Sequence, residues 1–205
     1  PSLLLNAGAS TQVLLQADYL RYDLTPDFGI GSLDGKIPTG IARSSYFNTP
    51  WAFNKAAQTN ASVTVDHKFS NTWKLNVVGS YQNFDRNYYS TERIQADAAG
   101  DWNRSLTRSR TAEDYFTAQA NLTGSFRTGR INHAILVGTD ADSYVNTSHT
   151  YNMIAAYDRI NLLDPTKYTP RVDMPDAKDS LRTEVPTYRL GYYVQDLISV
   201  SDKFK

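Results

Sequence analysis

The sequence has 205 residues and equal numbers of basic and acidic side chains, 21 of each, so no global field favours nucleic acid as a partner. It contains no cysteine, which excludes a disulfide scaffold, a thiolate metal site and a cysteine nucleophile. No stretch reaches the roughly 20 apolar residues that a transmembrane helix needs, and the longest candidate runs only from Ala134 to Val137.

From its start, the chain has the pattern of a series of two-faced strands. Residues 3–5 predict the end of one strand, and alternation of apolar and polar side chains predicts the others. In 57–69, for example, Val63, Val65 and Phe69 share one face, while polar side chains occupy the even positions. The predicted strands after the first are 12–24, 57–69, 73–89, 115–127, 131–145 and 187–198.

The connections between these strands alternate in length. The tight turns, rich in small and polar residues, are 6–9, 70–71 and 128–130. The long connections are 25–55, 90–112 and 148–184. Transmembrane β-barrels have this asymmetry, with short periplasmic turns and long extracellular loops. We therefore predict an all-β fold, an antiparallel transmembrane β-barrel segment of about six to seven strands from a larger barrel.

The same asymmetry predicts a direction for each strand and two belts of aromatic side chains on the apolar face. The strands that run from the tight turns toward the long loops are those near 10–24, 72–89 and 131–147. The strands that run in the opposite direction are those near 56–69, 113–127 and 186–199. The belt near the tight turns contains Phe69, Trp73 and Phe126. The belt near the long loops contains Tyr19, Tyr81, Phe116 and Tyr188. The path from Phe116 to Phe126 corresponds to roughly 25 Å of height at a tilt of about 40°.

A soluble all-β binding domain with half-buried strands is the alternative fold. It explains the alternation but neither the alternating loop lengths nor the two aromatic belts. Charge on the apolar face separates the two, because a soluble sheet tolerates Lys or Glu there and a membrane band does not. No Lys or Glu occurs on this face from Val13 to Tyr19, from Leu75 to Tyr81 or from Phe116 to Phe126.

Three segments resemble a known family. Ile131–Asp140 resembles the H-x-L-L-x-G-x-D/E strand of TonB-dependent siderophore receptors, and Leu190–Ser199 resembles their G-x-Y-x-Q-D strand. Residues 17–30 are similar to the strand and first long loop of the catecholate-type receptors, and 43–47 also fits that loop. One departure is Gly31, where those receptors often have proline.

The resemblance implies a receptor and transporter for ferric siderophores that lies in the bacterial outer membrane and is energised through TonB. It identifies 1–205 as one partial barrel domain, with the plug domain and the other strands of a barrel of about 22 strands outside it. Residues 202–205 are expected to form a turn between strands. The partners implied are the ferric siderophore, the TonB complex, outer-membrane lipid and lipopolysaccharide, with no nucleic acid and no enzymatic reaction. A passive porin, or a receptor for haem, cobalamin or a glycan, remains an alternative.

A ferric catecholate is a bulky anion with aromatic rings, so its binder needs cationic groups and aromatic surfaces. The odd–even alternation of side chains along each strand, which we call the strand parity, places one set of candidates on the polar face near the long loops. This set is Phe84, Arg86, Tyr88, Tyr22, Tyr115, Tyr144 and Arg189. The long loops offer a second set: Arg43, Tyr46, Phe47, Trp51, Arg93 and Trp102. The alternative for the residues of the first set is that they only line the barrel or touch the plug.

Three arginines, Arg104, Arg108 and Arg110, form a basic run without an acidic residue between them. They suit either a catecholate or the phosphates of lipopolysaccharide outside the barrel. Continuing the strand parity past Tyr115 turns them outward and favours lipopolysaccharide. Loop residues need not keep register, however, so both interpretations stay open.

The remaining polar side chains that could carry chemistry have simpler interpretations. His67 and His133 lie on the apolar parity near the tight turns, where an interfacial role is favoured over metal binding. The chelator supplies the ligands of iron, so we expect no cofactor bound directly and no protein metal site. Asp140 and Asp142 could act as an acid–base pair, but a wet barrel wall is expected to be polar in any case.

Overall fold

The computed structural model describes residues 1–200, so the turn expected at 202–205 lies outside the described residues. Its elements are all strands: β1 (Ser2–Ala7), β2 (Thr11–Leu24), β3 (Ser32–Leu33), β4 (Phe53–Lys68), β5 (Trp73–Thr91), β6 (Gln95–Ala96), β7 (Asp101–Thr128), β8 (Ile131–Tyr151), β9 (Ile154–Asn161) and β10 (Asp179–Ser199). Within this part of the chain no helix is long and apolar enough to cross a membrane.

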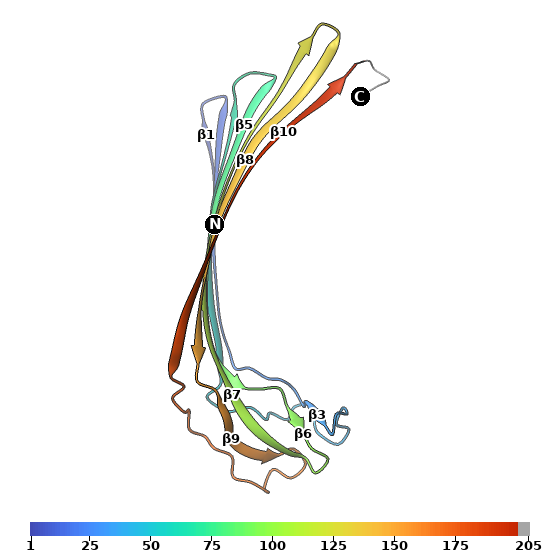
Figure 1. Cartoon of the computed structure of the whole chain (residues 1–205), viewed down its shortest axis with the longest axis vertical. Coiled ribbons are helices and arrows are strands. Elements are labelled where there is room, and N and C mark those ends of the chain that lie inside the picture. Colours follow the sequence, from blue (N-terminus) through green and yellow to red (C-terminus); the bar gives the residue numbers. More distant parts are fainter. Residues whose placement is uncertain (201–205) are drawn as a thin grey trace.

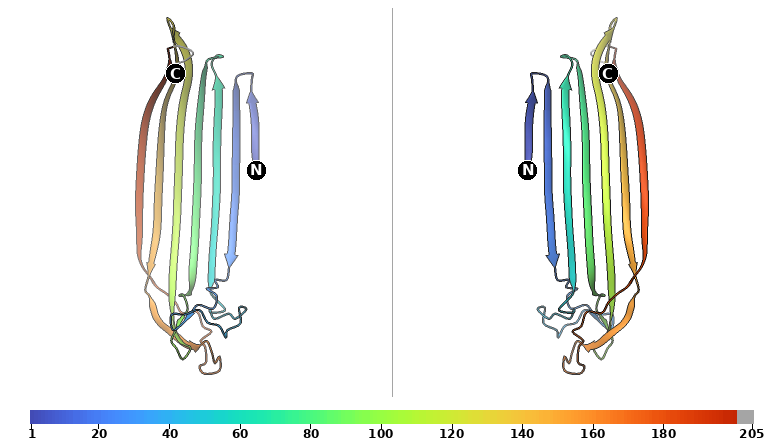
Figure 2. Two further views of the ribbon diagram at one scale, coloured as in Figure 1. Left: turned by 90° about the vertical axis from the view of Figure 1, so that its right-hand side faces the viewer. Right: turned by 90° about the vertical axis from the view of Figure 1, so that its left-hand side faces the viewer.

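One curved sheet makes up most of the molecule (Figure 1). Its strands follow the order β1-β2-β4-β5-β7-β8-β10, with each strand antiparallel to its neighbour in that order. The long strands lie side by side in sequence order (Figure 2). Strand β9 pairs with the start of β7, and β3 and β6 form a separate two-stranded parallel sheet. The predicted antiparallel, all-strand architecture is confirmed.

The connections lie at two ends of the sheet, as the alternating lengths predict. At one end are the tight turns after β1, β4 and β7, and at the other are the long connections after β2, β5 and β8 (Figures 1 and 2). Gly8 and Gly129 take positive φ angles of 79° and 62° in two of the tight turns, a conformation that glycine adopts at no steric cost. We refer to the tight-turn end and the long-loop end below.

The strand register gives the sheet an apolar face, which we call the outer face. Along one row of this face Tyr188 pairs with Ser143, Ser143 with Phe116 and Phe116 with Tyr81. Phe116 and Tyr81 of the predicted belt are therefore neighbours on adjacent strands, and Tyr188 lies in the same row beyond Ser143. Tyr19 lies in the next row toward the long loops. Apolar side chains of this face remain uncovered, including Phe116 at 50% and Val77 at 36% exposure.

The opposite, inner face is polar and its side chains join neighbouring strands. Asn60 of β4 donates to Asp18 of β2 at 2.6 Å. Ser80 of β5 and Thr117 of β7 share a hydrogen bond of 2.6 Å. Such cross-strand pairs stabilise a sheet and fix its register. In a closed barrel of this kind the polar face lines the interior.

The strands extend further toward the long loops than the sequence predicts. β7 begins at Asp101, so 101–112 is strand and the prediction of a connection over 90–112 is wrong there. The predicted connection 148–184 likewise contains the end of β8, all of β9 and the start of β10. Beyond the apolar band both faces of a strand are polar, so alternation disappears although pairing continues, for example Thr91 with Leu106.

The buried core of the described residues lies at the long-loop end, in the loops and in the strand ends next to them. We call the residues 25–52, 92–106 and 152–178 the loop cap. One apolar cluster contains Ile94, Ala96, Trp102, Ile160 and Leu162, with Leu33, Ile41 and Phe47 packed against it. A second contains Tyr89, Leu106 and Tyr157, with Trp51, Phe53, Ile154 and Ala177 packed against it. The three long connections therefore form one packed body.

Gly31 shows why the first loop can dock on the second. Its φ is +64°, and a Cβ built there would lie 2.3 Å from the Cβ of Ile94. Proline cannot adopt that φ, so this loop could not keep its path with the proline common in catecholate-type receptors. The next residue, Ser32, donates its backbone N–H to the Ile94 carbonyl at 3.1 Å. Glycine thus permits the β3–β6 contact.

Candidate functional site

The inner face carries a cation beside aromatic rings near the long-loop end of β5. The Nε of Arg86 donates to the Oδ1 of Asn54 on β4 at 2.9 Å. Its guanidinium lies 5.1 Å from the centre of the Tyr88 ring. Burial raises the pKa of the Tyr88 hydroxyl, so this phenol stays neutral at physiological pH. Arg86 and Tyr88 can therefore offer charge and a neutral ring to an anionic aromatic ligand.

Tyr22 approaches this pair across a small residue. It pairs with Ala56 of β4, and Ala56 pairs with Arg86 of β5. The spacing of neighbouring strands is about 4.8 Å, so Tyr22 and Arg86 lie about 10 Å apart at the backbone with only a methyl group between them. Phe84 lies on the same face, one pleat nearer the tight turns. We call Tyr22, Phe84, Arg86 and Tyr88 the mouth cluster.

The other predicted inner-face residues are not part of the mouth cluster. Tyr115 and Tyr144 pack edge-to-face, with ring centres 6.0 Å apart, in the row that contains Gln82. Arg189 forms an ion pair with Asp142 at 2.9 Å, in the row that contains Ser80. That row is six residues from Arg86, or roughly 20 Å along the strand. A single ligand of modest size would not contact both arginines.

The predicted loop residues divide into exposed and packed side chains. Arg43 and Arg93 are exposed, and Tyr46 is 43% exposed with its hydroxyl donating to the Thr49 carbonyl at 3.0 Å. Trp102 is only 6% exposed, because it lies inside the first apolar cluster. Trp51 packs at 4.9 Å from Tyr89 and 5.9 Å from Tyr157, while Phe47 packs against the first cluster.

Arg104 lies inside the loop cap, so it is not exposed at the outer surface as the outward interpretation expected. Its side chain is 3% exposed and that of its partner Asp158 is 5% exposed. The Nε of Arg104 donates to Asp158 Oδ1 at 2.6 Å, and its Nη1 donates to the Phe47 carbonyl at 3.1 Å. Trp102, Arg104 and Leu106 are buried in alternation with less buried residues, so the period of two continues here. This face of β7 is covered by Asp158 of β9 and by the first loop at Phe47.

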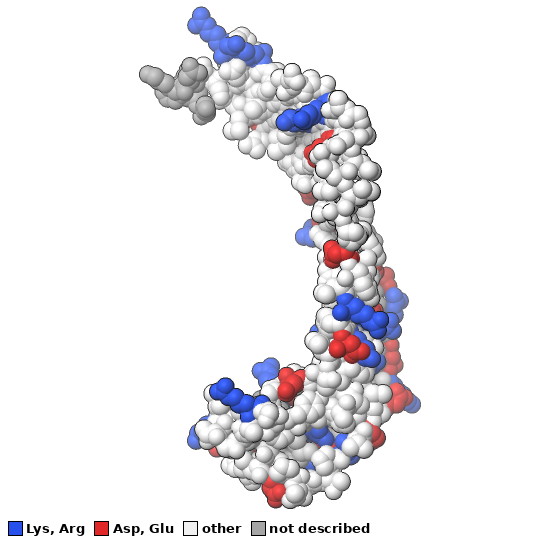
Figure 3. Space-filling view, turned by 180° about the vertical axis from the view of Figure 1, so that it is seen from behind, with Lys and Arg blue, Asp and Glu red and all other residues white. Residues whose placement is uncertain are grey.

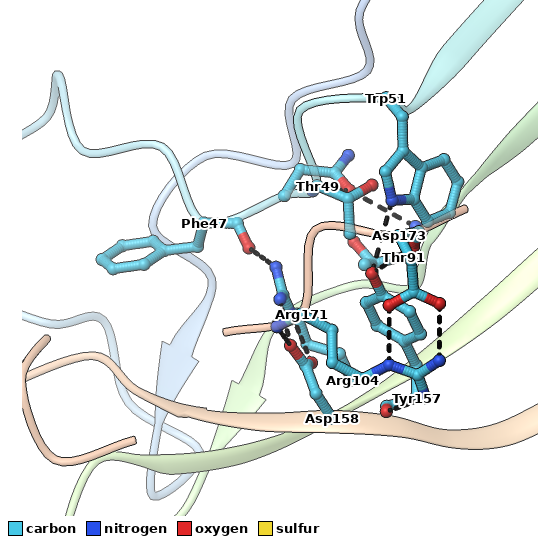
Figure 4. A network of polar contacts seen from close by, with 10 residues as sticks. Phe47, Thr49, Trp51, Thr91, Arg104, Tyr157, Asp158, Arg171 and Asp173 are labelled. Atoms are coloured by element: carbon cyan, nitrogen blue, oxygen red, sulfur yellow. Dashed lines mark hydrogen bonds and ion pairs between the residues drawn. The ribbon is translucent and has the colours of Figure 1, made fainter. Parts of the chain in front are cut away.

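Tyr157 connects this buried pair to the last long loop (Figure 4). The guanidinium groups of Arg104 and Arg171 lie 5.6 Å and 4.7 Å from its ring centre. Its hydroxyl donates to the Asp173 carbonyl and accepts from the Trp51 indole at 3.3 Å. Asp173 also holds the Arg171 side chain through both carboxylate oxygens. These contacts join the first loop, β7, β9 and the 162–178 segment.

Sequence reasoning missed most of this network. The side-chain oxygen of Asn48 accepts from the backbone N–H of Thr49 and from the hydroxyl of Thr91 in β5, both at 2.8 Å, and its amide donates to Ser90 at 2.7 Å. Asp101 accepts from Asn161 at 2.6 Å and from Lys167 at 2.9 Å. These partners are distant in sequence, so no local pattern indicates them. The single usable signal was the absence of alternation after residue 148, which predicts irregular chain but not its contacts.

A cavity of about 370 Å³ opens between the first and the last long loop. Its lining includes Tyr46, Arg104, Ile160 and Arg171, together with two prolines of the 162–178 segment. Both guanidinium groups are already paired with carboxylates, so the cavity is closer to neutral than its arginines suggest. Within residues 1–200 no group of three or more His, Cys, Asp or Glu side chains is placed to hold a metal ion.

Arg108 and Arg110 lie on the outer face, as parity predicts. Arg110 pairs with Asp85 at 3.6 Å, and Asp85 belongs to the outer face of β5. The guanidinium of Arg108 lies 5.2 Å from the ring centre of each of Phe53, Tyr89 and Tyr151. Figure 3 shows charged side chains concentrated along the part of the wall nearer the long loops, next to a mostly uncharged stretch.

Comparison with known proteins gives one family. The model of the "TonB dependent receptor-like, beta-barrel" family matches residues 2–205. Among curated proteins, the chain is 26% identical over 172 residues to the "Probable TonB-dependent siderophore receptor PiuA" of Acinetobacter baumannii, which covers 76% of this chain and 22% of that protein. It is 25% identical over 211 residues to the "Metal-pseudopaline receptor CntO" of Pseudomonas aeruginosa, which covers 100% of this chain and 29% of that protein.

Solved structures give the same fold. The crystal structure of the ferric-catecholate import receptor Fiu from Escherichia coli K12 matches with a TM-score of 0.77 and 16% identity over 98% of this chain and 31% of that one. The siderophore receptor PiuA from A. baumannii matches with a TM-score of 0.73 and 19% identity over 98% of this chain and 32% of that one. The chain thus spans about a third or less of each protein that it resembles.

Proposed function

This chain belongs to the TonB-dependent receptor β-barrel family, and from this premise we propose that it is part of the wall of an outer-membrane receptor that imports a ferric siderophore. The names of its relatives, a siderophore receptor and a receptor for a metal complex, support this proposal. Since the chain covers less than a third of either relative, the activity belongs to the whole receptor, of which these strands are one section.

An outer-membrane location accounts for the two faces of the sheet. The uncovered apolar band on the outer face, which includes Leu15, Val77 and Phe116, would otherwise contact water. Facing lipid, it has the alternation and aromatic belts of a transmembrane barrel. The tight-turn end then lies in the periplasm and the loop cap lies outside the cell.

The mouth cluster is the observation that carries the ligand proposal. Arg86 lies against the Tyr88 ring on the inner face, with Tyr22 on the neighbouring side of Ala56. A ferric siderophore bound there would meet a cation and two or three aromatic surfaces at the extracellular mouth. The iron arrives already chelated, so it is cargo, and the chain needs no cofactor of its own.

Uptake would be energised by the TonB complex, acting on regions outside these 205 residues. The role is transport and not catalysis, because moving an intact chelate across the membrane breaks no bond in it. The wall described here would contribute the path and part of the binding surface. A plug domain supplied by the rest of the polypeptide would close the barrel until TonB acts.

Deletion of the parent gene tests the transport proposal. Under iron limitation, the deletion strain should fail to grow on at least one ferric siderophore that supports the parent strain, and the cloned gene should restore growth. Unchanged growth on a full panel of catecholate, hydroxamate and mixed siderophores would contradict the proposal.

Replacement of Arg86 tests the mouth cluster in the full-length receptor. Arg86→Gln should weaken binding of the ferric siderophore about tenfold, the effect of losing one charged contact, measured by quenching of tryptophan fluorescence. Arg127→Gln removes a charge on the same face at the tight-turn end, far from the mouth, and serves as the matched control. Equal affinity of the Arg86 variant and the wild type would remove Arg86 from the site.

A second ligand class has one observation in its favour. CntO, named a receptor for a metal–pseudopaline complex, aligns with the whole of this chain. The mouth cluster would bind an anionic chelate of another transition metal by the same contacts. Competition between the ferric siderophore and a metal chelate of a pseudopaline-type ligand for the purified receptor decides between the two classes.

A further inference from the structure

Asn48, near the end of the first long loop, uses the whole of its side-chain amide. Its Nδ2 donates to the Pro26 carbonyl and to the Ser90 hydroxyl, both at 2.7 Å. Its Oδ1 accepts from the Thr49 backbone N–H and from the Thr91 hydroxyl, both at 2.8 Å. A primary amide has two donor hydrogens and two acceptor lone pairs, so these contacts use the full hydrogen-bonding capacity of Asn48.

The partners of Asn48 fix the direction in which its amide points. The Pro26 carbonyl can only accept a hydrogen bond and the Thr49 N–H can only donate one, so the amide nitrogen faces Pro26 and the amide oxygen faces Thr49. The nitrogen also faces Ser90, which makes the Ser90 oxygen the acceptor of that bond. The hydroxyl proton of Ser90 is therefore directed away from Asn48.

Asn48 takes the place of strand β4 beside the last residues of β5. Strand β4 begins at Phe53, which pairs with the residue before Ser90, so it does not reach the end of β5. There the Oδ1 of Asn48 lies 3.4 Å from the backbone nitrogen of Thr91. Ser90 and Thr91 are 0% and 1% exposed, so their hydroxyl groups depend on protein partners. One side chain thus attaches the first long loop to β5.

A second contact fixes the backbone immediately before Asn48. The carbonyl of Phe47 accepts from the Nη1 of Arg104 at 3.1 Å, and Arg104 is held by its buried ion pair with Asp158. The backbone at 47–48 is therefore held by the loop cap while the Asn48 side chain is held by β5. None of the contacts that place the Asn48 amide is made by a residue of the mouth cluster.

Ser90 connects Asn48 to the mouth cluster. It follows Tyr88 by two residues in β5, so both side chains lie on the inner face, one pleat apart. A buried hydroxyl needs an acceptor for its proton, and the Tyr88 phenol on the same face can provide one. Burial raises the pKa of Tyr88, and the Ser90 side chain opposes part of that rise, as a hydroxyl that donates to the phenol oxygen does.

From this geometry we propose that Asn48 is a positioning residue for ligand binding, acting through Ser90 on Tyr88. Asn48 donates to Ser90, Ser90 donates to the Tyr88 oxygen, and the phenol proton of Tyr88 is then directed into the barrel mouth. Hydrogen bonds in such a chain strengthen one another. Tyr88 is thereby prepared to donate to a negatively charged oxygen of the chelate, beside the Arg86 guanidinium. The inference deepens the proposed function and rests on it.

Titration of Tyr88 tests the chain of hydrogen bonds without any ligand. A fluorinated tyrosine is incorporated at position 88 of the full-length receptor, and its ionisation is followed by fluorine NMR. Ser90→Ala removes the hydroxyl that opposes the rise in the pKa of Tyr88, so this pKa should move further upward. The matched control is Ser80→Ala, on the same face of the same strand, where Ser80 shares a hydrogen bond with Thr117. It should leave the Tyr88 pKa unchanged.

Binding of an iron(III) tris-catecholate complex measures the effect on function. Tyr88→Phe, Ser90→Ala and Asn48→Ala should each weaken binding about tenfold, the effect of losing one hydrogen bond to a charged group. The double variant Tyr88→Phe/Ser90→Ala should bind as tightly as Tyr88→Phe alone, because Ser90 acts only through the phenol. Ser80→Ala should bind like the wild type, and heat-modifiable migration in gels checks that every variant is folded.

The conservative variant Asn48→Asp separates the donor role of Asn48 from its support of the loop. An ionised carboxylate keeps the acceptor oxygens but cannot donate to Ser90. This variant should therefore bind the tris-catecholate complex weakly at neutral pH and recover part of the affinity in acid, where the protonated carboxyl group donates again. Relative to the wild type at each pH, Asn48→Ala should show no such recovery.

Three results would overturn the inference. They are an unchanged Tyr88 pKa in Ser90→Ala, wild-type affinity in Asn48→Ala, and free-energy losses of Ser90→Ala and Tyr88→Phe that add in the double variant. Additive losses would restrict Asn48 and Ser90 to support of the first loop. If the wild-type receptor bound no tris-catecholate complex, the catecholate form of the proposed function would fail, whereas the titration of Tyr88 would still decide whether Ser90 acts on the phenol.

Discussion

The wall and the loop cap use opposite means to hold their side chains in place. In the wall, one face of each strand is apolar and uncovered, the other is polar, and few side chains are buried. In the loop cap, residues from three long connections are buried against one another, among them Trp102, Arg104 and Tyr157. The wall thus depends on its surroundings for burial, whereas the loop cap contains its own core. This difference explains where sequence reasoning succeeds.

The largest expected effect distinguishes the buried ion pair of the cap from an exposed pair of the wall. Arg104→Ala leaves the Asp158 carboxylate buried without its partner, which should cost the cap about 3–5 kcal/mol. Arg110→Ala removes an exposed pair with Asp85 and should cost less than about 1 kcal/mol. Hydrogen exchange in the full-length receptor measures both, at residues 154–173 for Arg104→Ala and at the β5 and β7 backbone around Asp85 and Arg110 for Arg110→Ala.

A double variant tests whether the loss of stability in Arg104→Ala comes from the unpaired Asp158 carboxylate. Arg104→Met combined with Asp158→Leu removes both charges and should recover much of the protection, because apolar residues can replace a buried pair. If Arg104→Ala exchanged no faster than wild type, the loop cap would not depend on this pair.

A charge placed on each face of the wall tests whether the two faces meet different solvents. Leu122→Arg, near the middle of the outer apolar band of β7, should destabilise the receptor in membranes by about 2–4 kcal/mol. Gln119→Arg, on the inner face of the same strand, should have a much smaller effect. The folded fraction after refolding into lipid vesicles is the measurement, and equal losses for the two variants would contradict the assignment of faces.

Substitution of two glycines in the first long loop distinguishes the cost of close packing from the cost of backbone strain. Gly31→Ala should cost about 2–3 kcal/mol, because its Cβ would overlap Ile94 and its φ is positive. Gly29 has a similar φ of +70° with open space around it, so Gly29→Ala should cost only about 1 kcal/mol. Limited proteolysis of the first loop in the intact receptor compares the two, and equal sensitivity would contradict the docking of this loop on Ile94.

The smallest effect is a dependence of the loop cap on acid. Hydrogen bonds from Asn161 and Lys167 lower the pKa of Asp101 from 3.8 to about 2. Because its folded pKa is depressed, Asp101 stabilises the cap above pH 3.8 and this contribution is lost as the pH falls toward 2. Exchange of the 154–168 backbone should therefore accelerate over that range. Asp101→Asn should reduce this acceleration, and the part that remains belongs to groups such as Asp164, whose pKa is lowered by hydrogen bonds from Thr166. An unchanged acid dependence in the variant would contradict the role of Asp101.

The wall could be predicted from the sequence because the pattern that specifies a two-faced strand lies within a short run of consecutive residues. Alternation over 57–69 or 115–127 reports directly which side chains share a face, and loop lengths report which ends of the strands coincide. Arg108 and Arg110 follow this parity onto the outer face. The sequence did not predict that 101–112 is strand, because beyond the apolar band both faces are polar and alternation vanishes.

The interior of the loop cap could not be predicted for a different reason. The burial of Arg104 depends on Asp158, 54 positions away, and the burial of Trp102 depends on Ile94 and Ile160. Gly31, a departure from the family pattern in the sequence, is explained only by its contact with Ile94. Partners this distant leave no periodic signal, so the loop candidates could be named but not divided into packed and exposed residues.

The central claim is that β7 carries a lipid face and a water face in alternation, and accessibility along this strand tests it most directly. Single cysteines at positions 116 to 126, introduced into a cysteine-free full-length receptor, are scored in membranes with a water-soluble thiol reagent and with lipid-borne quenchers of an attached fluorophore. The account predicts a period of two, with lipid contact at even positions such as 118, 120 and 122 and water contact at odd positions such as 117, 119 and 121. Accessibility without that period, or with the two sets exchanged, would contradict it.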